Sequence, residues 1–319
     1  MSDYFGNLYH AIEGYLEGGR HEIYDALVLE VTNGCSFGRC PTCYANCIPK
    51  GRRMSLAEVR GVFTTMQDLI RQGKMDEMPK EIWVAGGEPT DHPDLLHLIR
   101  EARRHVDYIA LVTNGFALAD PKYAKQIVDR AVGLSEVAIT LNSASPEAHN
   151  YMVQPIGTRY TVDGGEWVQV VRGLVEVTKA AEVARRSDLT VAINLNMNAS
   201  IYEHSLQDLV KVVRSYGGRI DKIIFQTMQM GGRAVDIKNR RYRQFQTVDE
   251  GMVKKYFDQA QRRIGSKDIR EAILIDPLNK GRASAKLQQH PMWGVGATPC
   301  VCADGRFEYN VVRTNPLHD

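Results

Sequence analysis

Six apolar segments that alternate with segments of helical period constrain the fold of this 319-residue chain more than any other feature. Each is rich in aliphatic and β-branched residues and almost continuously apolar, which is typical of strands covered on both faces in a parallel sheet. The predicted strands are residues 26–32, 81–87, 108–115, 136–143, 189–198 and 222–228.

Helices are predicted between these strands, at residues 55–73, 92–105, 120–132, 167–186 and 205–218. The first begins at Ser55, and Glu58 follows at the spacing of a capping box. The alternation predicts an α/β fold, either a sheet or a barrel of repeated βα units. After residue 235 the pattern changes: a helix is expected at 247–264 and a further strand at 271–277.

Polar and glycine-rich sequences follow all six predicted strands. In chain order they are NGCSFGRCPTCY, GGEPTDHPDL, TNGF, NSASPEAH, NMN and QTMQMGGRA. Because parallel α/β folds gather their reactive groups at the carboxyl ends of the strands, we expect these sequences to converge on one site.

Three of the six cysteines lie within nine residues, at positions 35, 40 and 43. Four explanations compete: buried thiols, a disulfide, a zinc site and an iron–sulfur cluster. The N-terminus has acidic residues and no apolar core of a signal peptide, and no segment reaches the 18 apolar residues of a membrane helix. We therefore expect a cytoplasmic protein without a membrane partner, in which thiols stay reduced and a disulfide is disfavoured.

The spacing favours a cluster over zinc. A structural zinc site normally has four ligands, often from two CxxC pairs, and only Cys40 and Cys43 form such a pair here. A four-iron cluster needs thiolates on a loop that can wrap around it, and Gly34 and Gly38 give this loop the required freedom. Three cysteines would leave one iron open for chelation by a substrate or cofactor. Zinc and buried thiols remain alternatives.

The sequence GGEPT follows the second predicted strand. Gly86 and Gly87 can expose backbone groups to a ligand and allow its close approach, and Glu88 can accept hydrogen bonds from an ammonium group. The alternative is a simple turn between strand and helix, punctuated by Pro89 and Asp91.

Together, the three-cysteine loop and GGEPT resemble the radical S-adenosylmethionine superfamily over about residues 26–235. The segments TNGFAL, LNSASPEAH and GGRA resemble sequences of one subgroup, which contains the molybdenum-cofactor cyclase and enzymes with SPASM-type extensions. The resemblance implies a partial (β/α)6 TIM barrel with a C-terminal extension. It also implies two cofactors, a [4Fe–4S] cluster and S-adenosylmethionine.

The resemblance assigns roles to particular residues. Cys35, Cys40 and Cys43 would be the metal ligands, and the open iron would bind the amino and carboxylate groups of S-adenosylmethionine. The remaining cofactor-binding residues by this likeness are Gly86, Gly87, Glu88, Asn114, Asn142, Ser143 and Asn196.

Two features depart from the family pattern. The usual spacing of the cysteines is three residues and then two, whereas here it is four and then two, a CX4CX2C motif. The family favours an aromatic residue just before the third cysteine, where it meets the adenine. Thr42 holds that position here, and whether Tyr44, which follows the cysteine, takes over the adenine contact is open.

The other cysteines are Cys47, Cys300 and Cys302. The sequence around the last two resembles the opening of a SPASM-type extension, but the tail has too few cysteines for one. We expect buried thiols, with a second metal site as the alternative. Similarly, His92 is expected to belong to a helix start.

The net charge of +2 does not require a nucleic-acid partner. For the basic run 238–243 we favour a solvated helix face, with a substrate phosphate site as the alternative.

We expect the chain to divide into three parts. These are an N-terminal helical segment at 1–25, the partial barrel of the radical S-adenosylmethionine core at 26–235, and a region that covers the substrate at 236–319.

The resemblance implies that the reduced cluster cleaves S-adenosylmethionine to a 5′-deoxyadenosyl radical that abstracts a hydrogen from a small-molecule substrate. A nucleotide or sugar nucleotide in a biosynthetic pathway is the preferred hypothesis, and an electron donor such as flavodoxin or ferredoxin is implied. The alternatives are a peptide-modifying enzyme of the same family and a non-catalytic iron–sulfur or zinc protein.

Overall fold

A computed structural model gives the fold over residues 10, 12, 26–37, 40, 43, 47–153, 165–197, 206–216, 220–227, 250–264, 271–275, 300–303 and 306–308. Within these residues, one sheet has the strand order β7-β6-β5-β4-β3-β2-β1-β8-β9. The predicted strands are β1 (Ala26–Thr32), β2 (Glu81–Gly86), β3 (Tyr108–Thr113), β4 (Glu136–Leu141), β5 (Thr190–Met197) and β6 (Lys222–Thr227).

Each of these six strands pairs in parallel with the next along the chain, which confirms the predicted α/β fold. The expected further strand is β7 (Glu271–Ile275), which pairs in parallel with β6. At the other edge, β8 (Cys300–Val301) pairs in parallel with β1 and antiparallel with β9 (Phe307–Glu308). Strands from beyond residue 235 thus extend the sheet at both edges, while the predicted division into domains stays a prediction.

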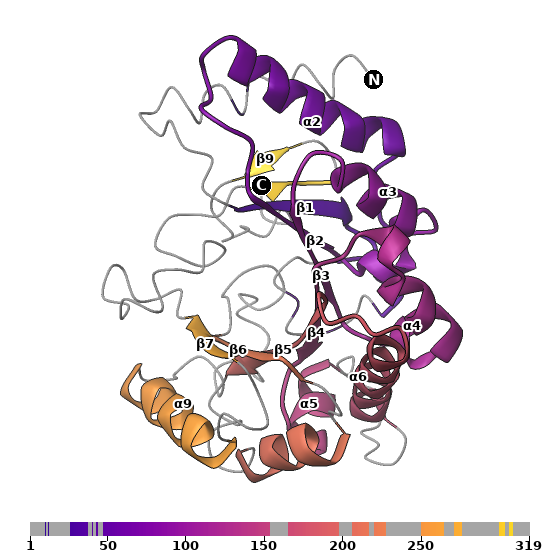
Figure 1. The fold of residues 1–319 in the computed structure, drawn as a ribbon. Coiled ribbons are helices and arrows are strands. Elements are labelled where there is room, and N and C mark those ends of the chain that lie inside the picture. Colours follow the sequence, from indigo (N-terminus) through magenta and orange to yellow (C-terminus); the bar gives the residue numbers. More distant parts are fainter. Residues whose placement is uncertain are drawn as a thin grey trace.

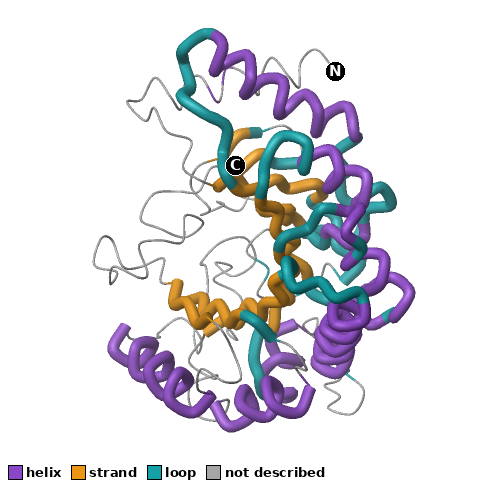
Figure 2. The backbone as a smooth tube through the Cα atoms, in the orientation of Figure 1, coloured by secondary structure: helices purple, strands orange, loops and turns teal. Residues whose placement is uncertain are grey.

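The sheet is curved, and helices cover its outer side (Figure 1). In the described residues these are α2 (Leu56–Arg71), α3 (Leu95–Ala102), α4 (Pro121–Val128), α5 (Pro146–Val153), α6 (Glu166–Val183) and α9 (Glu250–Ile264). Coloured by secondary structure, the strands form one continuous arc with helices outside it (Figure 2). Among the described helices, none combines the length and the apolar character that crossing a membrane requires.

Local signals explain where the helices begin and end. Ser55 and Glu58 form the predicted capping box, in which each side chain accepts a hydrogen bond from the other residue's backbone N–H. The predicted helix at 120–132 ends earlier, at Val128, and a 3₁₀ turn (Arg130–Val132) follows. The helix predicted at 205–218 begins at 206 in the described residues and closes with a π-helical turn (Val212–Tyr216).

The two faces of the sheet carry different side chains. Large aliphatic residues on the outer face, such as Leu27 and Leu29, belong to the same apolar cluster as Val62 and Phe63 of α2. The inner face is lined by small residues around one large ring, and these are Ala26, Ala110, Ala138, Ala192, Ile224 and Trp83. Small side chains suit the inner face because curvature crowds the residues on that side.

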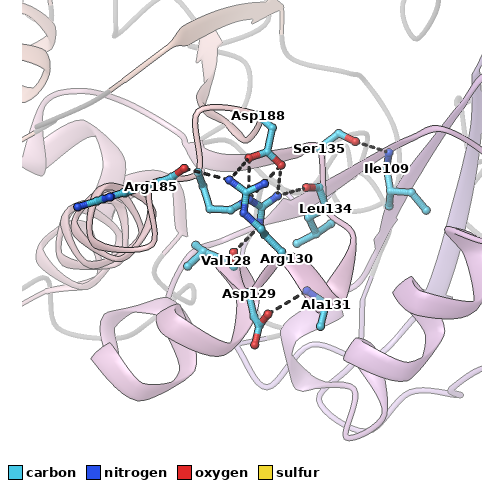
Figure 3. A network of polar contacts seen from close by, with 10 residues as sticks. Ile109, Val128, Asp129, Arg130, Ala131, Leu134, Ser135, Arg185 and Asp188 are labelled. Carbon is cyan, nitrogen blue, oxygen red and sulfur yellow. Dashed lines mark hydrogen bonds and ion pairs between the residues drawn. The ribbon is translucent and has the colours of Figure 1, made fainter.

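A polar network ties the helices to the sheet at the amino ends of β4 and β5, opposite the expected site. Arg186 is 2% exposed and donates hydrogen bonds to the carbonyl oxygens of Val128 and Leu134. Its guanidinium also pairs with Asp188, which Arg130 reaches from the other side at 3.3 Å (Figure 3). This buried cation is held by two carbonyl oxygens and a carboxylate and therefore serves the fold, away from the cavity described next.

Candidate functional site

Backbone hydrogen bonds hold the two ends of the cysteine loop together. The N–H of Cys35 donates to the carbonyl of Ile48 at 2.9 Å, and the N–H of Asn33 donates to that of Arg52 at 3.1 Å. The side-chain hydroxyl of Thr32 also donates to Arg52, at 2.9 Å. The loop therefore leaves the end of β1 and returns to it over a short paired stem.

This stem brings a fourth cysteine to the three predicted ligands. Cys35, Cys40, Cys43 and Cys47 all line one cavity, and the backbone N–H of Cys47 donates to Sγ of Cys43 at 3.4 Å. Cys47 is buried, as predicted, but its place beside the other three was missed. Cys47 lies there because it directly precedes Ile48, which pairs with Gly34, the residue before Cys35.

The thiols fit a metal by their chemistry, although no group of three or more ligand side chains in the described residues is already arranged as a metal site. Burial, and after it the negative charge of Glu88, raises the pKa of Cys35 to about 12. A hydrogen bond with Cys43, together with burial, raises the pKa of Cys47. The metal-free thiols of Cys35 and Cys47 are thus protonated, and a metal that binds Cys35 has to displace its proton.

Gly86 and Gly87 lie where two backbone segments almost touch. A Cβ atom on Gly86, whose φ is +133°, would lie 2.1 Å from the carbonyl oxygen of Thr32. A Cβ on Gly87 would lie 2.0 Å from that of Gly34. The N–H groups of Gly87 and Glu88 donate to these same two oxygens at 2.6 and 2.8 Å. The glycines therefore join the end of β2 to the cysteine loop, a reason for them that the sequence did not reveal.

Glu88 is buried among donors that the protein itself supplies. Its carboxylate accepts hydrogen bonds from the N–H and hydroxyl of Thr90 (3.1 and 2.5 Å), the hydroxyl of Thr113 (2.6 Å) and the N–H of Asn114 (2.7 Å). Burial raises the pKa of Glu88, although these hydrogen bonds act in the opposite direction. Glu88 lines the cavity and also braces the ends of β2 and β3.

Asp91 anchors the cysteine loop from the same GGEPTD sequence. Its carboxylate accepts the backbone N–H of Ser36 at 2.5 Å and the hydroxyl of Ser36 at 3.1 Å. The sequence suggested for Asp91 only the role of a turn residue. The sequence showed an acidic residue three positions after Glu88, but not its partner, because Ser36 lies 55 residues earlier in the chain.

Three asparagines bring carboxamides to the ends of β3, β4 and β5. Asn114, Asn142 and Asn196 all line the cavity, as predicted. The side-chain amide of Asn196 donates to Oδ1 of Asn142 at 2.6 Å, and Oδ1 of Asn114 accepts the N–H of Phe116 at 2.9 Å. This side of the cavity is therefore polar but uncharged.

Ser143 is not among the residues that line the cavity. It is completely buried, and its hydroxyl oxygen accepts the N–H of Ser145 at 3.1 Å. Asn142 lines the cavity, whereas Ser143, which follows it between β4 and α5, is buried away from it. The structure does not bring Ser143 to the predicted cofactor site.

His149 reaches the cavity from α5, and the sequence analysis did not select it. It is 1% exposed, and Nδ1 accepts the backbone N–H of Asn142 at 3.2 Å. Trp167 of α6 fixes α5 in place, since its backbone N–H donates to Asn150 and its indole N–H donates to the carbonyl of Ala144. The available signal was a histidine in the helix directly after a strand end.

The cavity has a volume of about 170 Å³ and opens to solvent on one side. Phe37 of the cysteine loop and Phe116, after β3, meet edge to face at its wall, with ring centroids 4.9 Å apart. Tyr44, the residue considered for the adenine contact, and Thr42 lie outside the described residues.

The other expectations have different outcomes. His92 is buried in the turn before α3, where it contacts the carbonyl of Met54 at 2.8 Å, as expected for a residue at a helix start. Cys302 is buried, also as expected. The side chain of Cys300 and the basic run 238–243 lie outside the described residues.

The fold and the cavity define an α/β protein with a cysteine loop after the first of its parallel strands. Residues 29–195 match the family model described as the Radical SAM superfamily. The chain belongs to this superfamily. Its enzymes use a [4Fe–4S] cluster and S-adenosylmethionine, the two cofactors that the sequence predicts.

Curated relatives and solved structures agree with this assignment. The chain is 24% identical over 215 residues to the GTP 3′,8-cyclase of Mesorhizobium japonicum, covering 64% of this chain and 55% of the relative. It is 25% identical to that of Brucella abortus, covering 64% and 53%. The chain thus spans about half the length of these relatives. Streptococcus suis SuiB bound to the precursor peptide SuiA shares the fold, with a TM-score of 0.59 and 12% identity over 90% of this chain and 59% of SuiB.

Proposed function

We propose that this chain abstracts a hydrogen atom from a small-molecule substrate, with Cys35, Cys40 and Cys43 as the ligands of the [4Fe–4S] cluster. The observation that supports this most is the single cavity that these cysteines share with the end of β2 and the asparagines of β3, β4 and β5. When bound, the cluster and S-adenosylmethionine supply electron transfer and radical chemistry.

The turn after β2 would orient the cofactor. It lies beside the cysteine loop, so we propose that its residues Gly86, Gly87 and Glu88 hold the methionyl end of S-adenosylmethionine. The negative charge of Glu88 acts on Cys35 strongly enough to raise its pKa. A buried carboxylate at this place attracts the methionyl ammonium group, even though its lone pairs already accept hydrogen bonds from the protein.

The uncharged carboxamides of Asn114, Asn142 and Asn196 would then receive the adenosyl part, further along the row of strand ends. The wall of the cavity is partly apolar, with Val112, Val153 and Val170 among its residues. Apolar walls exclude water and protect a reactive carbon radical from side reactions. An electron donor such as flavodoxin or ferredoxin completes the proposal.

A nucleotide is the substrate class that we favour. Its support is the similarity to GTP 3′,8-cyclases, which by their name act on GTP. A peptide substrate is the second candidate, and it has the weaker support because the likeness to SuiB extends to the fold alone.

Anaerobic reconstitution tests this proposal. The protein should take up about four irons per chain and release 5′-deoxyadenosine when it is reduced with S-adenosylmethionine. Cys40→Ala should abolish both, because two remaining thiolates seldom retain a cluster. A fully loaded Cys40→Ala variant would show that the ligand assignment is wrong. A colourless zinc protein without this product would refute the proposal.

A further inference from the structure

His149 lines the cavity and has one buried ring nitrogen without a hydrogen bond. Among the residues that the structure describes, no partner is found for its Nε2 atom. Buried polar atoms in native proteins almost always have a hydrogen-bond partner, so an exception of this kind points to a group that binds there.

The hydrogen bond at the other ring nitrogen identifies the tautomer. Nδ1 faces the backbone N–H of Asn142 at 3.2 Å and must therefore accept. In a neutral imidazole the proton is then on Nε2, which makes the unsatisfied atom a donor.

The ring stays neutral under ordinary conditions. Burial lowers the pKa of His149 to about 3. Burial disfavours the imidazolium form. Nε2 is thus a neutral N–H donor, and the partner that suits it is a neutral acceptor oxygen.

The surroundings of the ring narrow the choice of partner. His149 lies at the uncharged side of the cavity, with Thr140, Asn142 and Asn196 on the neighbouring strands and Val153 one turn further along α5. The charged side, with the carboxylate of Glu88 next to the cysteine loop, is at β1 and β2. A cofactor whose methionyl end lies on the charged side brings its sugar hydroxyls, and not its carboxylate, to the uncharged side.

We propose that the Nε2–H of His149 donates a hydrogen bond to a ribose hydroxyl oxygen of S-adenosylmethionine, an inference that rests on the proposed function. The bond would satisfy the donor and select for a cofactor with an intact ribose. Because the backbone N–H of Asn142 fixes the ring, the donor is already oriented before the cofactor arrives.

Two substitutions at His149 test the roles of Nδ1 and Nε2 separately. His149→Asn places an oxygen near the position of Nδ1, so it keeps the acceptor for Asn142 and removes the Nε2 donor. His149→Gln places an amide nitrogen near the position of Nε2, so it keeps the donor and removes the acceptor. Both variants are compared with the wild type as cluster-loaded protein, after thermal unfolding and iron content have been measured.

The readout is the affinity for S-adenosylmethionine and for its 2′-deoxy and 3′-deoxy ribose analogues, measured by anaerobic calorimetry. We expect His149→Asn to bind S-adenosylmethionine about tenfold more weakly than the wild type, and His149→Gln to bind it within about threefold. The wild type should bind one of the two analogues about tenfold more weakly than it binds S-adenosylmethionine. His149→Asn should show no such difference and should bind that analogue with the same affinity as S-adenosylmethionine.

A purely structural role for His149 predicts the reverse order. In that case His149→Asn would bind like the wild type and His149→Gln would be impaired, and this result would overturn the inference. Unchanged affinity in both variants would overturn it as well. A loaded wild type that does not bind S-adenosylmethionine at all would instead refute the proposed function.

Discussion

Ser36 gives both its backbone N–H and its hydroxyl to the carboxylate of Asp91, across 55 residues of sequence. The contact joins the cysteine loop to the turn after β2. Asp91→Ala removes both acceptors, and hydrogen bonds to a charged group are worth about 1.5–3 kcal/mol when buried and less at an exposed site. We therefore expect Asp91→Ala to lose iron to a chelator several times faster than the wild type.

The control for this experiment is Asp94→Ala. Asp94 stands three residues further on, at the start of α3, and its side chain makes no capping hydrogen bond. Iron loss from Asp94→Ala should match the wild type. Equal rates of loss from both variants would show that Asp91 does not hold the loop.

Cys47 tests how many of the four cysteines hold the metal. Its backbone N–H donates to Sγ of Cys43, and this contact survives in Cys47→Ala. We expect this variant to keep about four irons per chain after reconstitution, while Cys43→Ala loses most of them. An iron content in Cys47→Ala as low as in Cys43→Ala would identify Cys47 as a ligand.

Gly87 should tolerate no side chain, because a Cβ would lie 2.0 Å from the carbonyl oxygen of Gly34. Gly87→Ala forces the end of β2 away from the cysteine loop and breaks the hydrogen bonds between them, so we expect the free energy of unfolding to fall by about 3 kcal/mol.

Gly73→Ala is the control, measured with it by urea denaturation. Gly73 also has a positive φ, of +68°, but a Cβ there meets nothing within 4 Å. Backbone strain alone should lower the free energy of unfolding of Gly73→Ala by about 1 kcal/mol. Equal losses in the two variants would contradict the close approach at Gly87.

The burial of His149 predicts that acid destabilises the fold. The unfolded chain binds a proton at this residue below its usual pKa of 6.5, whereas the folded chain does so only near 3. The contribution of neutral His149 is therefore complete above pH 6.5 and is lost as the pH falls toward 3. At pH 5 the loss is about 2 kcal/mol.

Denaturation of the wild type and of His149→Asn at pH 7 and pH 5 measures this effect. The free energy of unfolding should fall less in His149→Asn, because that variant has no group to protonate at this position. Parallel pH dependence in the two proteins would show that His149 is not buried in its neutral form.

The sequence predicted the elements whose signals are local. Ser55 and Glu58 formed the capping box because both partners lie in one helical turn. The apolar runs predicted the strands because residues covered on both faces must be apolar almost throughout. The cavity-lining residues at the strand ends followed from the parallel topology, which places those ends side by side.

The sequence did not predict the contacts made between distant segments. Gly87 meets Gly34, and Ser36 meets Asp91, only once β1 and β2 are paired. Ser143 was assigned to the cofactor site with Asn142 by the family resemblance, but of these two residues Asn142 lines the cavity and Ser143 is buried beside it. His149 showed no ligand spacing, and its unsatisfied nitrogen exists only in the folded chain.

The central claim is that an iron of the cluster held by Cys35, Cys40 and Cys43 is left for the amino acid end of S-adenosylmethionine. The most direct measurement is electron–nuclear double resonance on the reduced, loaded protein with S-adenosylmethionine labelled at its amino nitrogen and carboxyl oxygen. We predict hyperfine coupling from both labels, and its disappearance in Cys40→Ala. A reduced cluster that shows no coupling to either label at saturating S-adenosylmethionine would contradict the account.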